Sequence, residues 1–262
     1  MFIEERHREI LRLLDEKGSI STSEIQERFG VGYDSAKRDL RILEEKGLLK
    51  RTHGGAISKN QTSASRPARD AVKELREERP GLAAIASYAV SLLRDGDNIF
   101  ISAAAIGLSM IKKLPEGINL RIATNSMILA AELRAKPNIK VIFIGGELDD
   151  KGACYDGFAL DILKRLRFDK CFVASTGISA GFGLSVQHSG TLPFWNAVLD
   201  ASVQRIGLYP SERFGADSSV SICPVGRLSC VITDWQAKRE KIAEFDELNV
   251  SVIVVDNPQT RG

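Results

Sequence analysis

The chain has 262 residues, of which 44% are hydrophobic and 27% charged, a composition that fits two folded domains and excludes a disordered chain. The formal net charge of +2 excludes a uniformly basic surface, so any contact with nucleic acid has to come from a local pattern of charges. The four cysteines lie far apart without a CxxC pair, which indicates reduced thiols rather than a disulfide framework or a zinc site.

The N-terminal segment MFIEERHREI is too charged for a signal peptide, and no apolar run in the chain reaches the length of a membrane span. We therefore expect a cytoplasmic protein with no membrane partner. Residues 4–17 predict an amphipathic helix, because their apolar side chains fall on one side and their charges elsewhere. Gly18 then ends this helix.

Two more helices and a hairpin are predicted next. The polar residues 21–23 cap a short helix that closes at Gly30, and a third helix runs over residues 33–46. LLKRT and GAIS predict two strands that flank His53-Gly54. Three helices followed by a hairpin are typical of a winged helix-turn-helix, which places one helix in the DNA major groove. The inner side of the third helix is predicted to consist of Ala36, Leu40 and Leu43.

The outer side of the third helix carries the donors that a recognition helix needs near its N-terminus. Arg38 and Arg41 can each give two hydrogen bonds to guanine or phosphate, and Lys37 supplies a point charge. Cations of the hairpin, Lys50 among them, would lie beside this helix. The side chains predicted to contact DNA are Ser21, Thr22, Tyr33, Ser35, Lys37, Arg38, Arg41, Arg51 and His53.

An ordinary solvated helix face is the alternative interpretation of this charge run. The charges alone do not decide between the two, because acidic residues nearby reduce the local excess of positive charge. These acidic residues are Asp34, Asp39, Glu44 and Glu45. The complete order of helices, polar cap, glycine turn, cationic helix and Gly-Gly hairpin favours DNA binding.

The chain changes character after the hairpin. Residues 59–70 (KNQTSASRPARD) are polar and lack apolar periodicity, which predicts a linker. A helical pattern over residues 71–93 is interrupted or restarted near Pro80-Gly81. Apolar strands then alternate with helical stretches, which is typical of an α/β domain with a largely parallel sheet. The predicted strands are NIFIS, RIAT, KVIFIG, KCFVAST, RIGLY, CVIT and SVIVV.

The N-terminal part contains RHREILRLLDEKGSISTSEIQERFGV and SAKRDLRILEEKGLLKRTHGGA, with KRDL inside the third helix and RTHGGA in the hairpin. This stretch resembles the DNA-binding domain of DeoR-type bacterial transcription regulators. Members of that family usually have Ser at the position of Gly32, Thr at Ser35 and Arg at Lys37, differences that would alter which operator is read. The resemblance implies a regulator, most often a repressor, that binds double-stranded operator DNA.

The second domain contains DGDNIFIS, IATNS, IGGEL, FDKCFVASTGIS, GLS, RFG and VITD, which follow the order of the sensor domain of that family. That domain is similar to the ribose-phosphate isomerase and CoA-transferase fold, so the resemblance implies a doubly wound α/β domain. It also implies a small effector, a sugar phosphate or a related metabolite, and a homo-oligomer, a dimer or a tetramer. The chain would then consist of a DNA-binding domain (1–58), a linker (59–74) and an effector-binding and oligomerisation domain (75–262).

The effector site is expected at the carboxyl ends of the strands, where glycine turns and helix N-termini present free N–H groups. Asn125 offers an amide, Gly145-Gly146 lets the backbone approach a ligand, and Glu147 can accept hydrogen bonds from hydroxyl groups. A tight turn without any role in binding is the alternative for each glycine. The residues predicted to bind the effector are Ser102, Ala103, Ala104, Ala105, Asn125, Gly145, Gly146, Glu147, Gly177 and Arg213.

Three motifs of the second domain depart from the family pattern. The phosphate loop Asp-x-Gly-Thr-Thr is replaced by SAAAIG at residues 102–107, and Asp-x-x-Lys-Phe-Gly by PSERFG at residues 210–215. Leu82 stands where the family often has a lysine, before Ile85-Ala86. A general base and its partner are therefore missing, which argues against isomerase catalysis, and we do not expect an enzyme.

Two ligand hypotheses follow from these departures. In the first, the N–H groups of residues 103–105 and the Arg213 guanidinium hold an anionic ligand of altered shape. In the second, the site takes a neutral or more apolar ligand and is lined in part by alanine, Phe182, Phe194 and Trp195. Phe194 and Trp195 also fit a place in the core.

Two other functions stay open. The sensor can be degenerate and respond to a protein partner, or the second domain can be an isomerase or transferase with a DNA-binding head. We expect no cofactor and no metal, because His7, His53 and His188 lack the spacing of metal ligands.

Overall fold

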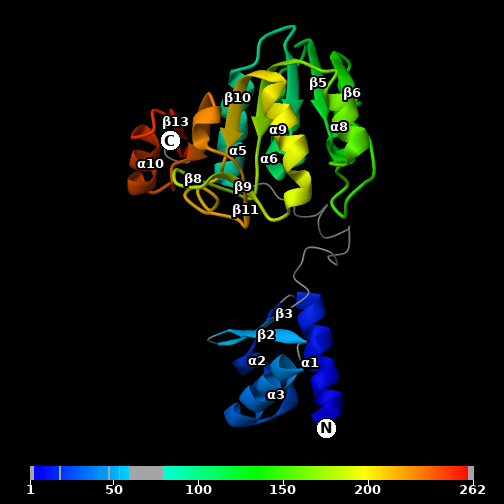
Figure 1. The fold of residues 1–262 in the computed structure, drawn as a ribbon, viewed down its shortest axis with the longest axis vertical. Helices are drawn as coiled ribbons and strands as arrows, with labels where there is room; N and C mark the ends of the chain where they lie inside the picture. The colour runs from blue at the N-terminus through cyan, green and yellow to red at the C-terminus, as the bar shows by residue number, and fades with distance from the viewer. Residues whose placement is uncertain (1–2, 18, 47, 53, 59–78, 259–262) are drawn as a thin grey trace. The chain divides into compact units, whose positions relative to one another are not determined.

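The computed structural model describes residues 3–17, 19–46, 48–52, 54–58 and 79–258. Contacts between residues divide the chain into two compact units, Met1–Pro67 and Ala68–Gly262, and each is described by itself (Figure 1). The predicted linker at 59–74 lies outside the described residues, as does the first part of the predicted helix at 71–93.

Helices and a three-stranded antiparallel sheet form the described part of the N-terminal unit. The strand order is β1-β3-β2, so the predicted hairpin gains a third strand from the segment before α2. The sequence does not predict this strand, because three residues are too few for a periodic pattern. The elements are α1 (Ile3–Lys17), β1 (Ser19–Ser21), α2 (Thr22–Phe29), α3 (Tyr33–Glu45), β2 (Leu49–Thr52) and β3 (Gly55–Ser58).

The core of this unit lies between the three helices and the sheet. Ala36, Leu40 and Leu43 on α3 are at most 1% exposed, which confirms the predicted inner side of this helix. They belong to one apolar cluster with Ile10 of α1 and residues of α2 and the strands. Gly30 ends α2 with a φ of 63°, a conformation that favours glycine, and so turns the chain into α3.

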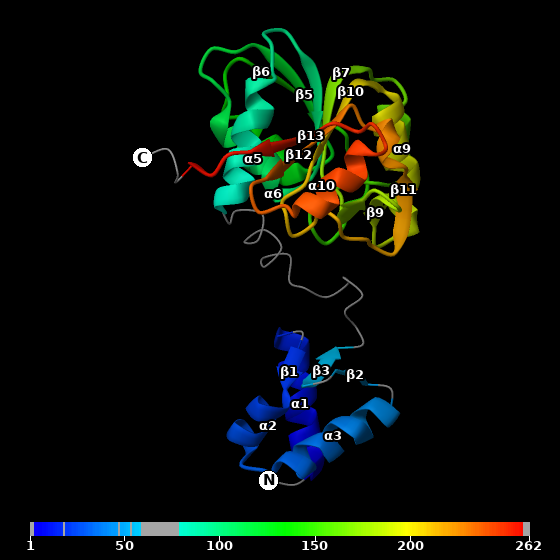
Figure 2. The same ribbon diagram turned by 90° about the vertical axis from the view of Figure 1, so that its left-hand side faces the viewer.

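Seven parallel strands form the central sheet of the C-terminal unit, in the order β13-β12-β10-β7-β4-β5-β6 (Figures 1 and 2). Each of the predicted strands is found in it, which confirms the doubly wound α/β prediction. The chain enters at β4, proceeds to β6 at one edge and returns to β7 beside β4. The carboxyl ends of β4 and β7 therefore form the topological switch point of the sheet. The strands are β4 (Asn98–Ile101), β5 (Leu120–Thr124), β6 (Ile139–Phe143), β7 (Phe168–Val173), β10 (Ser202–Leu208), β12 (Cys230–Asp234) and β13 (Val252–Val255).

Helices cover both faces of this sheet, as Figure 2 shows. One apolar cluster joins α5, α6 and α7 to one face, and a second joins α8, α9 and α10 to the other. Side chains alternate between the two, since Phe100 belongs to the second cluster and its neighbours Ile99 and Ile101 to the first. The helices are α5 (Pro80–Ser91), α6 (Ala105–Lys113), α7 (Met127–Leu133), α8 (Gly157–Leu163), α9 (Leu192–Asp200) and α10 (Arg239–Asp246), with short 3-10 turns η1 (Ser189–Thr191) and η2 (Val225–Arg227).

A small antiparallel sheet, β11-β9-β8, lies on the α9 side and was not predicted. Its strands are β8 (Gly177–Ser179), β9 (Gly183–Val186) and β11 (Val220–Cys223), too short and too rich in glycine and serine for an apolar pattern. A Cβ at Gly183 would lie 2.0 Å from the Cys223 carbonyl oxygen, so this glycine allows the strands to approach. Within the described ranges, the helices are all too short or too polar to traverse a lipid bilayer.

Candidate functional site

The outer side of α3 presents exposed polar and cationic side chains. Tyr33 is 49% exposed, and the Lys37 ammonium lies 4.7 Å from the centre of its ring, a cation–π contact in the first turns of the helix. Arg41 and Glu45 form an ion pair of 3.7 Å that is open to solvent and contributes little to stability. The exposed α3 residues among the predicted DNA contacts are Tyr33, Ser35, Lys37, Arg38 and Arg41.

One acidic residue of α3 faces the core instead of the solvent. Asp39 is 3% exposed, and its Oδ2 accepts a hydrogen bond of 2.7 Å from the Arg6 Nε on α1. Its Oδ1 lies 3.1 Å from the Arg6 Nη2 and 3.0 Å from the His7 Nε2. The hydrogen bond to Asp39 raises the pKa of Arg6. Asp39 therefore does not reduce the positive charge of the outer side, which favours the DNA-binding interpretation.

Ser21 and Thr22, at the start of α2, make local hydrogen bonds that cap this helix and join it to the hairpin. The Ser21 Oγ accepts a hydrogen bond of 3.0 Å from the Glu24 N, and the Glu24 carboxylate accepts one of 3.2 Å from the Ser21 N. Thr22 is 6% exposed, and its N and Oγ1 both donate to the Gly54 carbonyl, at 2.8 and 3.1 Å. The Thr22 side chain thus holds the tip of the hairpin against α2, and its contact with DNA stays a prediction.

The hairpin brings a further cation to α3. The Arg51 N donates a hydrogen bond of 2.8 Å to the Glu44 Oε1, which joins β2 to the last turns of α3. His53, predicted to contact DNA, lies outside the described residues, as does the side chain of Lys50. We name the described cations of this surface the cationic face, which consists of Lys37, Arg38, Arg41 and Arg51.

At the switch point of the C-terminal unit, Ser102 joins β4 to β7. Its N donates a hydrogen bond of 3.1 Å to the Phe172 carbonyl, and its Oγ accepts one of 3.1 Å from the Ala174 N. Ser102 is 2% exposed, so its hydroxyl serves the sheet rather than the surface. Ser102 thus positions the two strands, and its contact with an effector stays a prediction.

The N-terminus of α6 follows directly after Ser102. Its N-cap residue is Ala104, and no side chain of the described residues caps it. Ala103, Ala104 and Ala105 are partly exposed, so their backbone is accessible at the edge of the sheet. N–H groups at such a helix start are suited to an anion.

Asn125 follows β5 on the same edge of the sheet and is 1% exposed. Its Nδ2 donates a hydrogen bond of 3.0 Å to the Cys154 carbonyl, while its Oδ1 accepts none from the described residues. Burial raises the pKa of the neighbouring Tyr155 to about 12. The Asn125 Oδ1 is therefore an unfilled acceptor, which is costly in a buried position.

The loop after β6 contains the predicted Gly145, Gly146 and Glu147. A Cβ at Gly146 would lie 2.2 Å from the Asp156 Oδ1, and the Glu147 N donates a hydrogen bond of 2.7 Å to the Asp156 Oδ2. Asp156 also caps α8 by accepting a hydrogen bond of 2.9 Å from the Ala159 N. The close approach of Asp156 explains why a glycine stands at position 146. The side chain of Glu147 is exposed.

Gly177 and Arg213 lie beyond the end of β7. A Cβ at Gly177 would lie 2.4 Å from the Ala216 carbonyl oxygen, so close packing of two backbone segments explains this glycine. The exposed Arg213 donates a hydrogen bond of 3.4 Å from its Nη1 to the Ser175 carbonyl. Since Ser102 bonds to Ala174, the structure brings Ser102 and Arg213 to neighbouring residues at the switch point.

Sequence reasoning missed two buried hydroxyl groups beneath this point. The Ser175 Oγ lies 2.6 Å from the Tyr209 Oη and donates a hydrogen bond of 3.1 Å to the Gly177 carbonyl. Burial raises the pKa of Tyr209, which keeps its hydroxyl group neutral. A lone Ser and a lone Tyr give no pattern in the sequence that could have revealed this pair.

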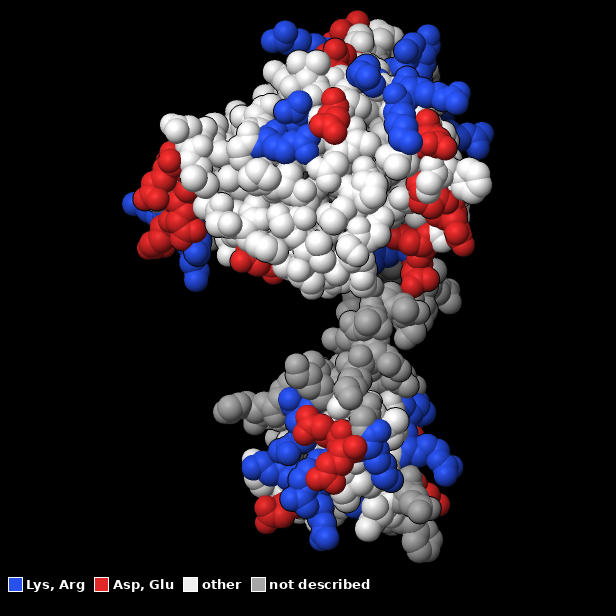
Figure 3. Space-filling model, in the orientation of Figure 1, with Lys and Arg blue, Asp and Glu red and all other residues white. Residues whose placement is uncertain are grey.

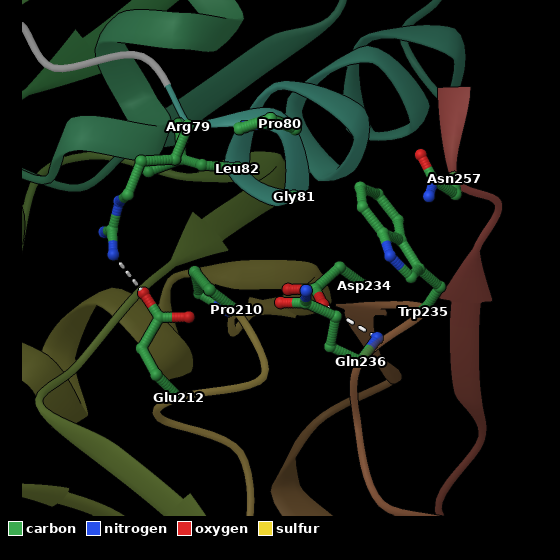
Figure 4. Close-up of a pocket in the computed structure, with 10 residues that line it drawn as sticks. All are labelled: Arg79, Pro80, Gly81, Leu82, Pro210, Glu212, Asp234, Trp235, Gln236 and Asn257. Carbon is green, nitrogen blue, oxygen red and sulfur yellow. Dashed lines mark hydrogen bonds and ion pairs between the residues drawn. The ribbon is translucent and has the colours of Figure 1, made fainter. Parts of the chain in front are cut away.

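A pocket of about 390 Å³ opens on the same edge of the sheet, at the ends of β10 and β12 (Figure 4). Leu82 and the first turn of α5 form one side, and the turn with Pro210 and Glu212 forms another. An ion pair between Arg79 and Glu212 crosses from α5 to that turn. None of the residues predicted to bind the effector is among the described residues that line this pocket. Two of the departures from the family pattern, at Leu82 and at residues 210–215, do reach it.

Asp234 lies at the base of this pocket and is 1% exposed. Its Oδ2 accepts a hydrogen bond of 2.9 Å from the Ser211 N, and its Oδ1 one of 3.0 Å from the Gln236 N. A Cβ at Gly81 would lie 2.9 Å from the Asp234 Oδ2, so the carboxylate packs against the start of α5. Asp234 thus holds α5 and the loops after β10 and β12 together.

The aromatic wall of the second ligand hypothesis is not found. Phe194 is fully buried and Trp195 is 5% exposed, and both pack on the Tyr155 ring, at 5.3 and 6.1 Å between centroids. The two side chains belong to the core on the α9 face, so the hypothesis that they line the pocket is wrong. The described residues contain no group of three side chains that could hold a metal ion.

Comparison with known proteins identifies both units. Residues 6–62 match the family model of the DeoR-like helix-turn-helix domain, and residues 81–235 match that of the DeoR C terminal sensor domain. The chain is 32% identical over 252 residues to a lactose phosphotransferase system repressor of Staphylococcus epidermidis, covering 92% of this chain and 96% of that protein.

Two further likenesses are more distant. The glycerol-3-phosphate regulon repressor of Escherichia coli K12 is 28% identical over 231 residues, covering 88% of this chain and 90% of that protein. A structure of ribose 5-phosphate isomerase A from Methanocaldococcus jannaschii is similar with a TM-score of 0.38 and 14% identity, covering 50% of this chain and 52% of that one.

Proposed function

The chain belongs to the DeoR family of transcription regulators, and from this premise we propose that it is a repressor that binds operator DNA through α3 and releases or gains it with a small metabolite. Two relatives are named as repressors, one of a lactose phosphotransferase system and one of a glycerol-3-phosphate regulon. The observation that carries the proposal is the cationic face on α3 and β2.

The cationic face supports contact with DNA in two ways. Lys37, Arg38 and Arg41 project from the outer side of a helix whose inner side is held in the core, so they are presented at fixed spacing. The buried Asp39 is neutralised by Arg6 and leaves the outer charges in excess. Guanidinium groups on such a helix reach both base edges and phosphates.

The test is the affinity for an operator selected from random duplexes, measured by fluorescence anisotropy. We expect Arg38→Ala and Arg41→Ala to weaken binding by about tenfold or more, with at least one of them relaxing the base preference. The slope of log Kd against log salt should fall by about one for each phosphate that the variant no longer binds. Arg12→Ala, an exposed arginine of α1, is the matched control. Wild-type affinity of both α3 variants would contradict the assignment of the recognition helix.

For the effector we propose a sugar phosphate or a related anion at the switch point of the sheet. The uncapped N-terminus of α6 and the exposed Arg213 support a negative group there, and the unfilled Asn125 Oδ1 supports a hydroxyl donor nearby. The names of the two repressors refer to a lactose phosphotransferase system and to glycerol 3-phosphate, a phosphorylated polyol, which supports a phosphorylated metabolite.

The effector is tested by adding phosphorylated and unphosphorylated sugars to the repressor–operator complex. We expect one phosphorylated compound to raise the thermal midpoint of the protein and to change its operator affinity, since a ligand must bind one state better to shift the equilibrium. A panel that changes neither quantity would contradict metabolite control and favour control by a protein partner.

A further inference from the structure

One long stretch of the sensor unit has no charge. Residues 171–199 contain no Lys, Arg, Asp or Glu, although these types make up 27% of the chain. The stretch forms β8, β9, η1 and α9 after the end of β7. Figure 3, in the orientation of Figure 1, shows a broad face without charged residues over α9 and the small sheet. We name this the uncharged face.

The uncharged face reaches the solvent. Phe182, in the turn between β8 and β9, is 39% exposed. Its N donates a hydrogen bond of 3.1 Å to the Ser179 Oγ, and its carbonyl accepts one of 2.7 Å from the Ser221 Oγ, so the turn is held in place. The other exposed residues of the stretch are Thr176, Gly181, Gln187, His188, Ser189, Gly190 and Pro193.

The face is also anchored to the core and bordered by a neutralised charge. Phe194, Val198 and other inward side chains of α9 are buried in the core, which fixes the exposed side of the helix. The first charge after the stretch, Asp200, forms an ion pair of 2.5 Å with Arg227. Arg227 also donates a hydrogen bond of 2.8 Å to the Asn196 Oδ1. The charge next to the face is thus already satisfied within one chain.

We propose that the uncharged face is the surface through which two copies of this chain associate. A two-fold interface places each patch against the same patch of its partner, so a charged residue near the axis meets a like charge. A face without charges avoids this conflict, and the centres of interfaces are depleted in charged residues. Recognition of a different protein by complementary charges would need charged side chains on this face, and the face has none.

This inference rests on the proposed function, which requires paired heads. Winged helix-turn-helix proteins read two half-sites with two copies of the recognition helix. Association through the sensor units supplies the second copy. The proposal names the surface of the sensor unit at which two copies meet, which neither the family match nor the DNA-binding surface indicates.

Gly190 is suited to a test because a Cβ there would meet nothing within 4 Å, so a long side chain fits the single chain. We expect Gly190→Arg and Gly190→Glu each to weaken self-association of the full chain by about tenfold or more in sedimentation velocity. Ala131→Arg and Ala131→Glu are matched controls, because Ala131 is exposed on α7, which covers the opposite face of the sheet. They should associate as the wild type does, and thermal melting should show that all four variants fold.

Self-association of both Gly190 variants at wild-type strength would overturn the proposal, as would a monomeric wild type. Operator binding separates this failure from that of the proposed function. Gly190→Arg should bind a single half-site normally and lose affinity only for the complete operator. Arg38→Ala should lose both and still associate. If the wild type associates with itself but binds no operator, the DNA-binding function is contradicted and the proposed interface is not.

Discussion

Arg6 of α1 and Asp39 of α3 form a buried ion pair, with 2.7 Å between the Arg6 Nε and the Asp39 Oδ2 and side-chain exposures of 10% and 4%. Asp39 is the next residue after Arg38, so the pair fixes the helix from behind the side chain expected to read DNA. The pair adds a polar contact to the apolar packing of Ala36, Leu40 and Leu43 that holds the inner side of α3 in the core.

Replacing Arg6 by Ala should loosen α3. The substitution leaves the Asp39 carboxylate buried without its main partner, which typically costs about 3–5 kcal/mol. Hydrogen–deuterium exchange of the full chain should show faster exchange across Tyr33–Glu45. Arg12→Ala removes an exposed ion pair with Glu9 and should change exchange by no more than about 1 kcal/mol. Equal exchange in the two variants would contradict a structural role of the pair.

Gly177→Ala should destabilise the sensor unit. The added Cβ would lie 2.4 Å from the Ala216 carbonyl oxygen, so the backbone has to shift, a change that costs about 1–3 kcal/mol. Gly181→Ala is the control, because a Cβ there meets nothing within 4 Å. It should leave the thermal midpoint unchanged or raise it slightly. If the thermal midpoint of Gly177→Ala equals that of the wild type, the backbone at Ala216 moves away from residue 177 at no cost, which contradicts this prediction.

Asp156 should make the loop after β6 sensitive to acid. The hydrogen bond from the Ala159 N, followed by that from the Glu147 N, lowers the pKa of Asp156 below its ordinary 3.8. A folded pKa below the unfolded value gives a stabilising contribution that is present above the unfolded pKa and is lost as the pH falls through the folded one. Asp156→Asn should therefore lower the thermal midpoint at pH 7, with a difference that shrinks below about pH 4.

The control for this pH dependence is Asp161→Asn, also on α8, where the carboxylate pairs with Lys164 at the surface. Its difference from the wild type should be small throughout. If the Asp156→Asn difference is the same at pH 3 and pH 7, the carboxylate does not carry the effect.

Arg213→Ala should weaken the binding of a phosphorylated effector. A hydrogen bond to a charged group contributes about 1.5–3 kcal/mol, so the Kd in calorimetric titration should rise about 10- to 100-fold. The unphosphorylated analogue should bind equally to both proteins. Arg134→Ala, an exposed arginine after α7, is the control. Binding that survives both the removal of the phosphate and the replacement of Arg213 would rule out the anionic hypothesis.

The features that the sequence predicts correctly are local and repeated. The central strands are buried on both faces, so each one is a continuous apolar run, and the inner side of α3 repeats at one-turn spacing. Short strands such as β8 carry no such run. They form because Gly177 and Gly183 allow close approach to segments far along the chain.

The role of a single polar side chain could not be predicted, because its partner is distant in sequence. Thr22 bonds to Gly54, 32 positions away, and Ser102 to Ala174, 72 positions away. Each looks in the sequence like an available hydroxyl group on a surface loop. Only the fold shows that the hydroxyl is already used inside the protein.

The bonds of Ser102 have a mechanical consequence for the sensor. The last backbone pair between β4 and β7 is Ile101 with Phe172, and Ser102 continues the connection with one backbone and one side-chain hydrogen bond. The two halves of the sheet are therefore joined beyond the point where their strands end. A ligand bound at this edge, as proposed above, could separate β4 from β7 only by breaking these two hydrogen bonds of Ser102.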